Sequence, residues 1–307
     1  MRIVVALGGN ALLQRGERPD AAPQRHHVAE AATALAPLAA AHQLIICHGN
    51  GPQVGVLAEE SQADPALSAP FPLDVLGAQT QGMIGYWLVQ ELRNAGINRP
   101  IAALVSQTLV DPADPAFSHP AKFIGPVYEE MHARLLAARL GWSVAADGPN
   151  WRRVVPSPRP LGLVEIDTIR ALADAGTLVV CGGGGGIPVT RAADGRLSGI
   201  EAVVDKDLTA AALAISLDAD RLLVLTDVPA LMRDFGTPAA APISAIDTTA
   251  LAGLNFPAGS MGPKVLACAE FALATGKPAA IGGLADADAI LHGQAGTAIT
   301  EAPVPAR

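Results

Sequence analysis

The chain consists of short apolar runs separated by longer segments rich in alanine and leucine. The apolar runs are continuous rather than alternating, which is typical of parallel strands buried on both faces of a sheet. The predicted strands are residues 3–7, 44–47, 101–105, 177–181, 222–225 and 279–281. Helical segments lie between them, around residues 24–41, 74–95, 129–140, 167–175, 206–217 and 261–275. This alternation predicts an α/β fold, a mainly parallel open sheet with helices on both sides.

Residues 106–160 interrupt this rhythm with eight prolines. Within this region, residues 142–147 and 151–155 have the pattern of two strands joined by a turn at Gly148-Pro149-Asn150. We therefore predict a small inserted subdomain that is partly antiparallel. A second hairpin is predicted further on, with strands at 187–190 and 197–199.

The composition is that of an ordinary folded chain. Its 307 residues allow one large domain or two smaller ones, and a chain of this length buries most of its unfolded surface. Half of the residues are apolar and only 16% are charged, which excludes a disordered, strongly solvated chain. The net charge of −8 argues against nucleic acid as the main partner, because phosphate backbones favour clustered lysine and arginine.

Two further features bear on where the protein works. The apolar run 3–7 is too short for a secretory signal and no run reaches about 18 residues, so we expect neither a signal peptide nor a membrane span. The three cysteines, Cys47, Cys181 and Cys268, are widely spaced and lie in apolar segments. They match no disulfide framework or zinc-ligand spacing, so free buried thiols in a cytoplasmic protein are expected.

Glycine or a small polar residue follows nearly every predicted strand. In an open parallel sheet, ligands bind at the carboxyl ends of the strands. Glycines there let backbone N–H groups approach an anion, and the N-terminus of the next helix adds partial positive charge. Geometry alone explains a single glycine turn, but the series predicts an extended anionic ligand, a nucleotide together with a phosphorylated group. The strand ends run into Gly8-Gly9-Asn10, His48-Gly49-Asn50, the five glycines 182–186, Thr226-Asp227 and Gly282-Gly283.

Known phosphate-binding motifs do not account for these turns. The chain has no Gly-x-x-x-x-Gly-Lys-Ser/Thr motif and no Gly-x-Gly-x-x-Gly motif. Gly49, Gly51 and Gly55 form a looser variant of the dinucleotide pattern, which keeps a Rossmann-type dehydrogenase as a rival interpretation.

The scarcity of lysine singles out a few residues. Of the 21 basic residues only four are lysine and the other 17 are arginine, so each lysine is a candidate for a role that needs a compact ammonium group. Lys206 lies at a predicted strand-to-helix transition, Lys264 opens the helix predicted at 261–275, and Lys122 lies in the irregular insert. Lys277 has no such surroundings, and we predict that it is a solvated loop charge.

Lysines at glycine-lined strand ends suit phosphoryl transfer. The transferred group spreads negative charge over its equatorial oxygens, and catalysis consists mostly of positioning and cationic stabilisation. Asp205 and Asp207 flank Lys206, and one of them would orient the lysines by ion pairing. No general base is required, because an anionic acceptor needs no deprotonation. His48, the histidine inside a glycine motif, is interpreted as structural.

Longer motifs occur in a fixed order at residues 4–12, 48–55, 107–117, 183–189, 199–207 and 256–264. They include Gly183-Gly184-Gly185-Gly186-Ile187-Pro188-Val189 and Val203-Val204-Asp205-Lys206-Asp207. In sequence, spacing and total length, these motifs resemble the carbamate kinases of the amino acid kinase superfamily.

The resemblance implies a three-layer αβα sandwich formed by a single domain over residues 1–307, with a protruding subdomain inserted at 118–160. Residues 1–205 would bind carbamate and the phosphoryl group, and residues 206–307 would bind the nucleotide. The implied reaction is reversible phosphoryl transfer from ATP to carbamate, giving ADP and carbamoyl phosphate. Mg²⁺ would be held mainly by phosphate oxygens, with no assigned protein ligand. A homodimer and a role in arginine metabolism are also implied.

The resemblance further implies roles for individual residues. Lys206 would stabilise the transition state, Lys264 would reach the ATP phosphates, Asp207 would organise the lysines, and Lys122 would close over the site. The implied substrate-binding residues are Gly8, Gly9, Asn10, Gly49 and Asn50. The implied nucleotide-binding residues are Gly184, Gly185, Thr226, Asp227, Met232, Met261 and again Lys264.

The chain departs from the family pattern at two places. Ala121-Lys122-Phe123 stands where the family usually has Thr-Lys-Pro, and Leu231-Met232 stands where the family often has a tyrosine near the adenine. A methionine can still cover a base by dispersion.

Two alternative functions stay open. One is a kinase of another small carboxylate or phosphonate, and the other is a non-catalytic sensor of nucleotide or acyl phosphate.

Overall fold

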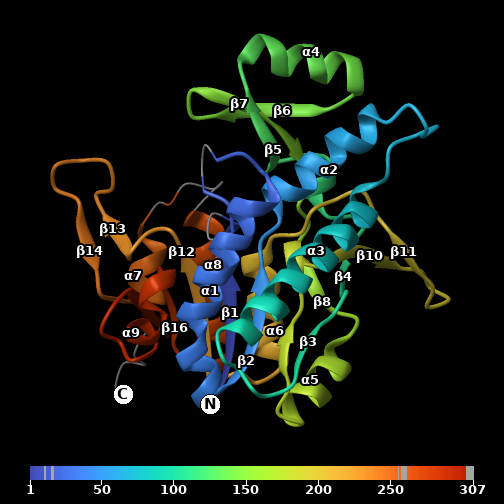
Figure 1. Ribbon diagram of the computed structural model, residues 1–307. Helices are drawn as coiled ribbons and strands as arrows, with labels where there is room; N and C mark the ends of the chain where they lie inside the picture. Colours follow the sequence, from blue (N-terminus) through green and yellow to red (C-terminus); the bar gives the residue numbers. More distant parts are fainter. Residues whose placement is uncertain (10–11, 15–16, 255, 257–260, 302–307) are drawn as a thin grey trace.

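Strand β1 (Arg2–Leu7) lies inside the largest sheet of the protein, with β12 on one side and β2 on the other. We describe a computed structural model, which covers residues 1–9, 12–14, 17–254, 256 and 261–301 (Figure 1). The sheet has eight strands in the order β15-β17-β16-β12-β1-β2-β9-β3. The strands from β16 to β3 in this order are parallel, and β17 runs antiparallel to β16. The other strands are β2 (Gln43–His48), β3 (Ile101–Ala103), β9 (Leu178–Val180), β12 (Arg221–Thr226), β15 (Ala245–Asp247), β16 (Ala279–Gly283) and β17 (Thr297–Thr300).

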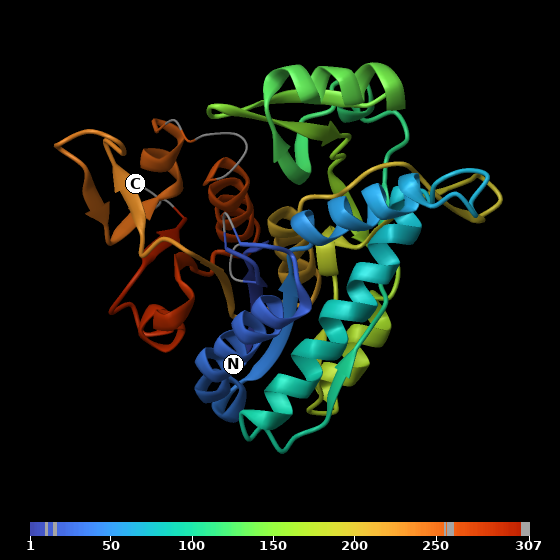
Figure 2. The ribbon, with the colours of Figure 1, turned by 45° about the horizontal axis from the view of Figure 1, so that its top comes forward.

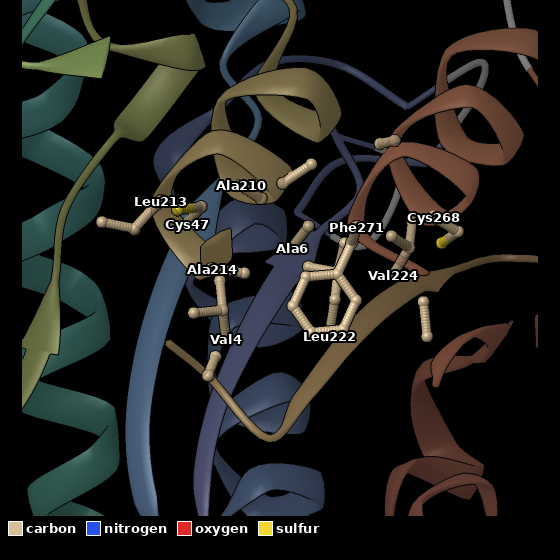
Figure 3. Close-up of a cluster of buried hydrophobic side chains, with 14 of the residues drawn as sticks. Val4, Ala6, Cys47, Ala210, Leu213, Ala214, Leu222, Val224, Cys268 and Phe271 are labelled. Atoms are coloured by element: carbon tan, nitrogen blue, oxygen red, sulfur yellow. The ribbon is translucent and has the colours of Figure 1, made fainter. Parts of the chain in front are cut away.

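Helices cover both faces of this sheet, because the side chains of each strand alternate between the two faces. Ile3, Val5 and Leu7 pack into a core with α1 (Ala21–Ala41), α3 (Leu73–Asn94) and α9 (Ala287–Leu291). Val4 and Ala6 pack on the other face, as Figure 3 shows. The helices on that face are α5 (Ile166–Asp174), α6 (Lys206–Ser216), α7 (Thr248–Ala252) and α8 (Met261–Thr275). The predicted three-layer αβα architecture is therefore confirmed.

Helices α6 and α8 lie side by side on this second face. Both helices place small, fully buried residues in the core of this face, Ala210 and Ala214 on α6 and Ala267 and Cys268 on α8. Small side chains allow two helix backbones to approach closely. This packing brings the N-terminal turns of both helices to the same end of the sheet.

Smaller sheets surround the main one. Strands β10 (Ile187–Arg191) and β11 (Leu197–Gly199) form the predicted hairpin, which joins β4 (Gln107–Val110) and β8 (Pro160–Leu163). Strands β13 (Leu231–Arg233) and β14 (Ala241–Ile243) form a second hairpin. The short 3₁₀ turns are η2 (Pro115–Phe117), η3 (Gly183–Gly185) and η4 (Leu284–Asp286).

One unit projects beyond the three layers. It is a three-stranded antiparallel sheet in the order β5-β7-β6 with a helix across it, and we call residues 122–155 the protruding unit (Figures 1 and 2). Its elements are β5 (Lys122–Tyr128), α4 (Glu130–Leu140), β6 (Ser143–Asp147) and β7 (Asn150–Val155). The two predicted strands of the insert correspond to β6 and β7, which pair in an antiparallel register as expected.

The chain also holds elements that the hydrophobic pattern does not predict. Helix α2 (Gly51–Ala63) begins in a segment whose glycines and proline favour a turn, yet Pro52 occupies the first turn of the helix, where a missing N–H is tolerated. The short strands β4 and β8 lie outside the main sheet and carry too few apolar residues to be recognised. All three cysteines are buried and free, as predicted. Within the described part of the chain, no helix has the length and apolar character needed to cross a bilayer.

The core on the α6–α8 face makes a direct prediction about stability. Phe271 of α8 is fully buried, whereas Leu273 two residues later is 58% exposed. Phe271→Ala leaves a cavity and should lower the free energy of unfolding by about 3–5 kcal/mol. Leu273→Ala on the same helix should change it by less than about 0.5 kcal/mol. Urea unfolding followed by circular dichroism measures both, and similar losses in the two variants would contradict this assignment of the core.

Candidate active site

The candidate site lies at the carboxyl ends of the central strands. The chain runs from β1 to its neighbour β2 on one side, while β12 lies on the other side of β1. Where the connections from neighbouring strands lead to opposite sides in this way, an open α/β sheet has a crevice at its strand ends, and ligands bind there. The strand ends there carry Gly8, Gly49 and Thr226, and the N-terminal turns of α6 and α8 face the same region.

The N-terminus of α6 is held by the side chain of Asp205. Its Oδ1 accepts hydrogen bonds from the backbone N–H groups of Asp207 (2.9 Å) and Leu208 (3.4 Å). Aspartate is a preferred residue for this capping position, because its carboxylate satisfies donors that have no partner within the helix. The cap fixes the first helical residues, Lys206 and Asp207, relative to the helix axis.

Two lysines share the carboxylate of Asp207. Lys206 Nζ donates to Asp207 Oδ1 at 2.5 Å, and Lys264 Nζ donates to Asp207 Oδ2 at 3.1 Å. The Asp207 side chain is 3% exposed, the Lys206 side chain 8% and the Lys264 side chain 15%. A buried carboxylate between two buried ammonium groups links α6 to α8 directly. The structure thus brings together three of the four predicted catalytic residues.

This arrangement changes the ionisation of all three groups. Although burial opposes it, the ammonium groups of Lys206 and Lys264 hold the pKa of Asp207 well below its usual range, so Asp207 is ionised near pH 7. Burial lowers the pKa of Lys206, although the negative charge of Asp207 raises it in part. For Lys264, burial is outweighed by Asp207, which raises the pKa.

The fourth predicted catalytic residue, Lys122, enters from the protruding unit. It lies at the start of β5, opposite Val155 of β7, and its Nζ donates to Oδ2 of Asp205. Its side chain is 29% exposed, more than those of the other two lysines. Phe123 follows in the same ladder, and the guanidinium of Arg152 lies 5.8 Å from the centre of its ring. Three lysines from separate elements therefore bind two carboxylates within one turn of α6.

A close backbone contact holds the start of the protruding unit in place. A Cβ atom on Gly55 of α2 would lie 1.9 Å from the Cα atom of Gly125 in β5, and Gly125 itself has a φ of +71°. Only glycine fits at Gly55, because the obstructing atoms belong to the backbone. This contact fixes the distance between α2 and the strand that carries Lys122.

The glycines at the ends of β1 and β2 also touch each other. The Gly8 N–H donates to Leu225 O (2.8 Å) and the Gly49 N–H donates to Leu7 O (3.0 Å), so both turns extend the ladder of the sheet. A Cβ atom on Gly49 would lie 2.8 Å from the backbone nitrogen of Gly9. Three predicted substrate-binding glycines are therefore neighbours. Asn10, also predicted to bind substrate, lies outside the described residues.

The five-glycine run is explained largely by packing. Four of its members have positive φ, and a Cβ atom on Gly183, Gly184, Gly185 or Gly186 would lie 2.0–2.3 Å from a neighbouring atom. The carbonyl oxygen of Gly185 accepts hydrogen bonds from the hydroxyl groups of Thr108 (2.7 Å) and Thr209 (2.9 Å). Close packing against other parts of the site therefore requires glycine at these positions, so the glycine run alone does not demonstrate a bound anion.

Asn50 and His48 line the same region. Asn50 is 4% exposed, donates to the hydroxyl of Thr80 (2.9 Å), and lies against Gly184, a predicted nucleotide-binding residue. His48 is 1% exposed with its Nδ1 3.0 Å from the carbonyl of Gly49. Burial lowers the pKa of His48 to about 4, so the ring is neutral at pH 7. A neutral, buried imidazole bonded to the backbone agrees with its structural interpretation.

The other predicted nucleotide-binding residues follow β12 or begin α8. The Thr226 hydroxyl donates to Asp227 Oδ1 at 3.0 Å, directly after β12, and Asp227 also raises the pKa of Lys264. Met232 lies on β13, opposite Pro242 of β14, and Met261 is the first residue of α8. All of these residues come after residue 206 in the chain, and Met261 lies on the same helix as Lys264.

Lys277 lies away from this cluster. It precedes β16 at the opposite end of the sheet, where its Nζ donates to Asp218 Oδ1 at 2.6 Å. The Asp218 side chain is 85% exposed, so this is a surface ion pair. The prediction of a surface charge is confirmed, with the addition of a partner that the sequence does not reveal.

The geometry favours binding of a highly charged anion. Each ammonium group has three N–H donors, and the bonds described above use one of each, so further donors remain for phosphate oxygens. Both carboxylates within the cluster are engaged by lysines, and His48 is neutral and bound to the backbone. The site is therefore built to stabilise transferred negative charge rather than to remove a proton.

Comparisons with known proteins agree with this geometry. The model of the amino acid kinase family matches residues 1–283. Among curated proteins, carbamate kinase of Haemophilus influenzae is 50% identical over 302 residues, covering 98% of this chain and 97% of the relative. Carbamate kinase of Rhizobium meliloti is 48% identical over 303 residues, covering 98% and 93%.

Solved structures give the same result. Carbamate kinase from Giardia lamblia bound to citric acid superimposes with a TM-score of 0.92 at 42% identity, covering 98% of each chain. The same enzyme bound to AMP-PNP superimposes with a TM-score of 0.88 at 41% identity, again covering 98% of each chain.

The contact between Gly55 and Gly125 generates a prediction about the protruding unit. Gly55→Ala should push β5 away from α2 and loosen the unit, so that trypsin cleaves at Arg134 and Arg139 of α4 about tenfold faster than in the unchanged protein. Gly82→Ala in α3 is the matched control, because nothing lies within 4 Å of the added methyl group. Limited proteolysis with mass spectrometry measures both rates. Equal rates in the two variants would show that the contact does not hold the unit.

Proposed function

The chain belongs to the amino acid kinase family and is one of its carbamate kinases, and on that premise we propose how its site carries out the reaction. The reaction is ATP + carbamate ⇌ ADP + carbamoyl phosphate, an ATP-dependent phosphoryl transfer. The observation that supports this proposal is the convergence of Lys122, Lys206 and Lys264 on two adjacent aspartates at the strand ends.

The lysines divide the charge of the transferring group among them. Lys206 is the most buried and lies between the other two along the cluster, so we assign it the stabilisation of the transferring phosphoryl group. Lys264, on the helix next to the predicted nucleotide residues, would bind the ATP phosphates. Lys122 would approach from the protruding unit on the opposite side. Asp207 would hold Lys206 and Lys264 at a fixed separation without touching the substrate.

Carbamate is expected to bind between the first two strand ends. Gly8, Gly9 and Gly49 lie close together there, and Asn50 follows Gly49 in the chain. Asn10, which lies outside the described residues, stays a predicted substrate-binding residue. Carbamate is already an anion, so its oxygen attacks the γ-phosphorus without the loss of a proton. This fits a site in which His48 is neutral and both aspartates of the cluster are paired with lysines.

The nucleotide is expected on the other side of Lys264. Asp227 raises the pKa of Lys264 and accepts a hydrogen bond from Thr226, and Met261 lies three residues before Lys264 on α8. Met232 on β13 would complete this side. We further propose that Gly184 and Gly185 act mainly through shape, because they are packed against Asn50 and Val204. The structure of Giardia lamblia carbamate kinase bound to AMP-PNP supports nucleotide binding by this fold.

We propose Mg²⁺ as the metal that accompanies the nucleotide. No group of three or more metal-ligating side chains occurs among the described residues, and the two carboxylates of the lysine cluster are occupied by lysines. These residues fit a cation carried by phosphate oxygens, a common mode for Mg²⁺. Such an ion would neutralise phosphate charge and align the transferring group.

The larger organisation follows from the same proposal. Residues 1–205 would form the carbamate and phosphoryl side and residues 206–307 the nucleotide side of one domain, with 118–160 as its inserted subdomain. A homodimer and a role in arginine metabolism remain predictions that come from the family, and a cytoplasmic location remains a prediction from the sequence.

The central role of Lys206 is testable by substitution. Lys206→Ala should lower kcat for ATP formation from ADP and carbamoyl phosphate by about 10²-fold or more, as for other lost transition-state donors. Lys277→Ala is the control, since its surface ion pair lies at the other end of the sheet, and it should change kcat less than about twofold. A coupled assay for ATP measures both.

Three results would contradict parts of the proposal. Unchanged turnover in Lys206→Ala would refute the role of that lysine. A wild-type protein that makes ATP from another small acyl phosphate but not from carbamoyl phosphate would refute the substrate. Nucleotide binding without any turnover would favour the sensor.

Removal of the metal tests the role of Mg²⁺ separately. An excess of EDTA should abolish ATP formation, and added Mg²⁺ should restore it, because phosphate charge must be neutralised for transfer. The fold should not change, since no group of metal-ligating side chains is found in the described residues. Circular dichroism in EDTA serves as the control, and full activity in EDTA would contradict the proposal.

A further inference from the structure

Asp205 uses its two carboxylate oxygens for two different partners. Oδ1 accepts the N–H groups of Asp207 and Leu208 at the start of α6, and Oδ2 accepts the ammonium group of Lys122 from the protruding unit. The residue is 7% exposed, so both interactions are largely shielded from water. We propose that Asp205 is a positioning residue for the transfer reaction, which holds Lys122 in register with Lys206 and Lys264. This rests on the proposed function of the site.

Lys122 needs such a partner more than the other two lysines do. Its side chain is 29% exposed, and its flexible four-carbon stem loses considerable entropy when it is held in one position. The Gly55–Gly125 contact places the β5 backbone, but Gly125 lies three positions along the strand from Lys122. An anchoring carboxylate fixes the ammonium group itself.

Asp205 is suited to be this anchor because it is rigid. The cap bonds to the α6 backbone fix the orientation of its carboxylate, and Lys206 is the next residue along the chain. Covalent geometry therefore sets where Lys122 lies relative to Lys206 and, through Asp207, relative to Lys264. Holding reacting and stabilising groups in place before the reaction lowers its entropic barrier.

The two interactions of Asp205 can be separated by substitution. Asparagine caps a helix about as well as aspartate, so Asp205→Asn keeps the α6 cap while it removes the negative charge that binds Lys122. A purely structural cap would therefore tolerate asparagine. A positioning role requires the charge, and it requires Lys122 to be present.

A double-mutant cycle of Asp205→Asn and Lys122→Met tests the proposal. In the unliganded full chain, each single variant should raise the amide hydrogen-exchange rate of β5 about threefold or more, and the double variant should exchange no faster than Lys122→Met alone. In the ATP-forming assay, Asp205→Asn should lower kcat about tenfold in the unchanged protein but less than about twofold when Lys122 is already methionine. Asp205→Ser, a second capping residue without charge, should behave like Asp205→Asn.

The outcomes decide the proposal. The proposal would be overturned if Asp205→Asn and Asp205→Ser left the hydrogen-exchange rate of β5 unchanged. It would also be overturned if Asp205→Asn lowered kcat equally in the wild-type protein and in the Lys122→Met variant. Circular dichroism establishes that each variant is folded before either comparison. Absence of ATP formation by the wild-type protein would refute the proposed function, whereas the exchange cycle would still report whether Asp205 holds Lys122.

Discussion

The rest of the site depends on one buried carboxylate, Asp207, placed between two ammonium groups. Transfer of a lone charge into a protein interior is costly, and a buried charge persists only when it is paired and hydrogen-bonded. Asp207 is 2% exposed and binds both Lys206 and Lys264, so its charge stabilises both ammonium groups and offsets their mutual repulsion. Removal of Asp207 would leave two ammonium groups inside the protein without the counter-charge that they share. The same interaction therefore holds α6 to α8 and assembles the cationic centre of the site.

The fold supplies what this cluster needs. Parallel strands end at one edge of the sheet, and α6 packs beside α8 so that Lys264 in the first turn of α8 binds Asp207 in the first turn of α6. The protruding unit adds the third lysine across a contact so close that Gly55 cannot carry a side chain. Each of these features depends on how closely the backbone segments pack. Together they place the ammonium groups of the three lysines around the space for a phosphoryl group.

Much of this organisation could be predicted from the sequence, because it is encoded locally. Continuous apolar runs predict the central strands, and the scarcity of lysine together with neighbouring glycine and aspartate residues singles out Lys122, Lys206 and Lys264. The position of Asp205 and Asp207 beside Lys206 predicts that one of them pairs with the lysines, and the family resemblance implies Asp207. What the sequence could not predict are contacts between distant segments. Asp205 binds Lys122 across 83 positions.

Other distant contacts were equally hidden. The closeness of Gly55 to Gly125 has no local signature, and helix α2 was obscured by glycine and proline residues that favour a turn on their own. The glycines 183–186 correctly indicated the site, whereas anion binding by them stays a prediction, because close packing alone already explains why they are glycine. Packing against His48, Asn50, Val204 and Thr108 accounts for their presence.

The most direct test of this mechanism is a crystal structure with MgADP, carbamate and tetrafluoroaluminate, which imitates the transferring phosphoryl group. We predict that the fluoroaluminate lies at the carboxyl ends of β1 and β2, with the Nζ atoms of Lys206 and Lys264 within hydrogen-bonding distance of its fluorine atoms and Asp207 still bound to both lysines. A fluoroaluminate bound elsewhere, or at that place without contact to either lysine, would contradict the mechanism.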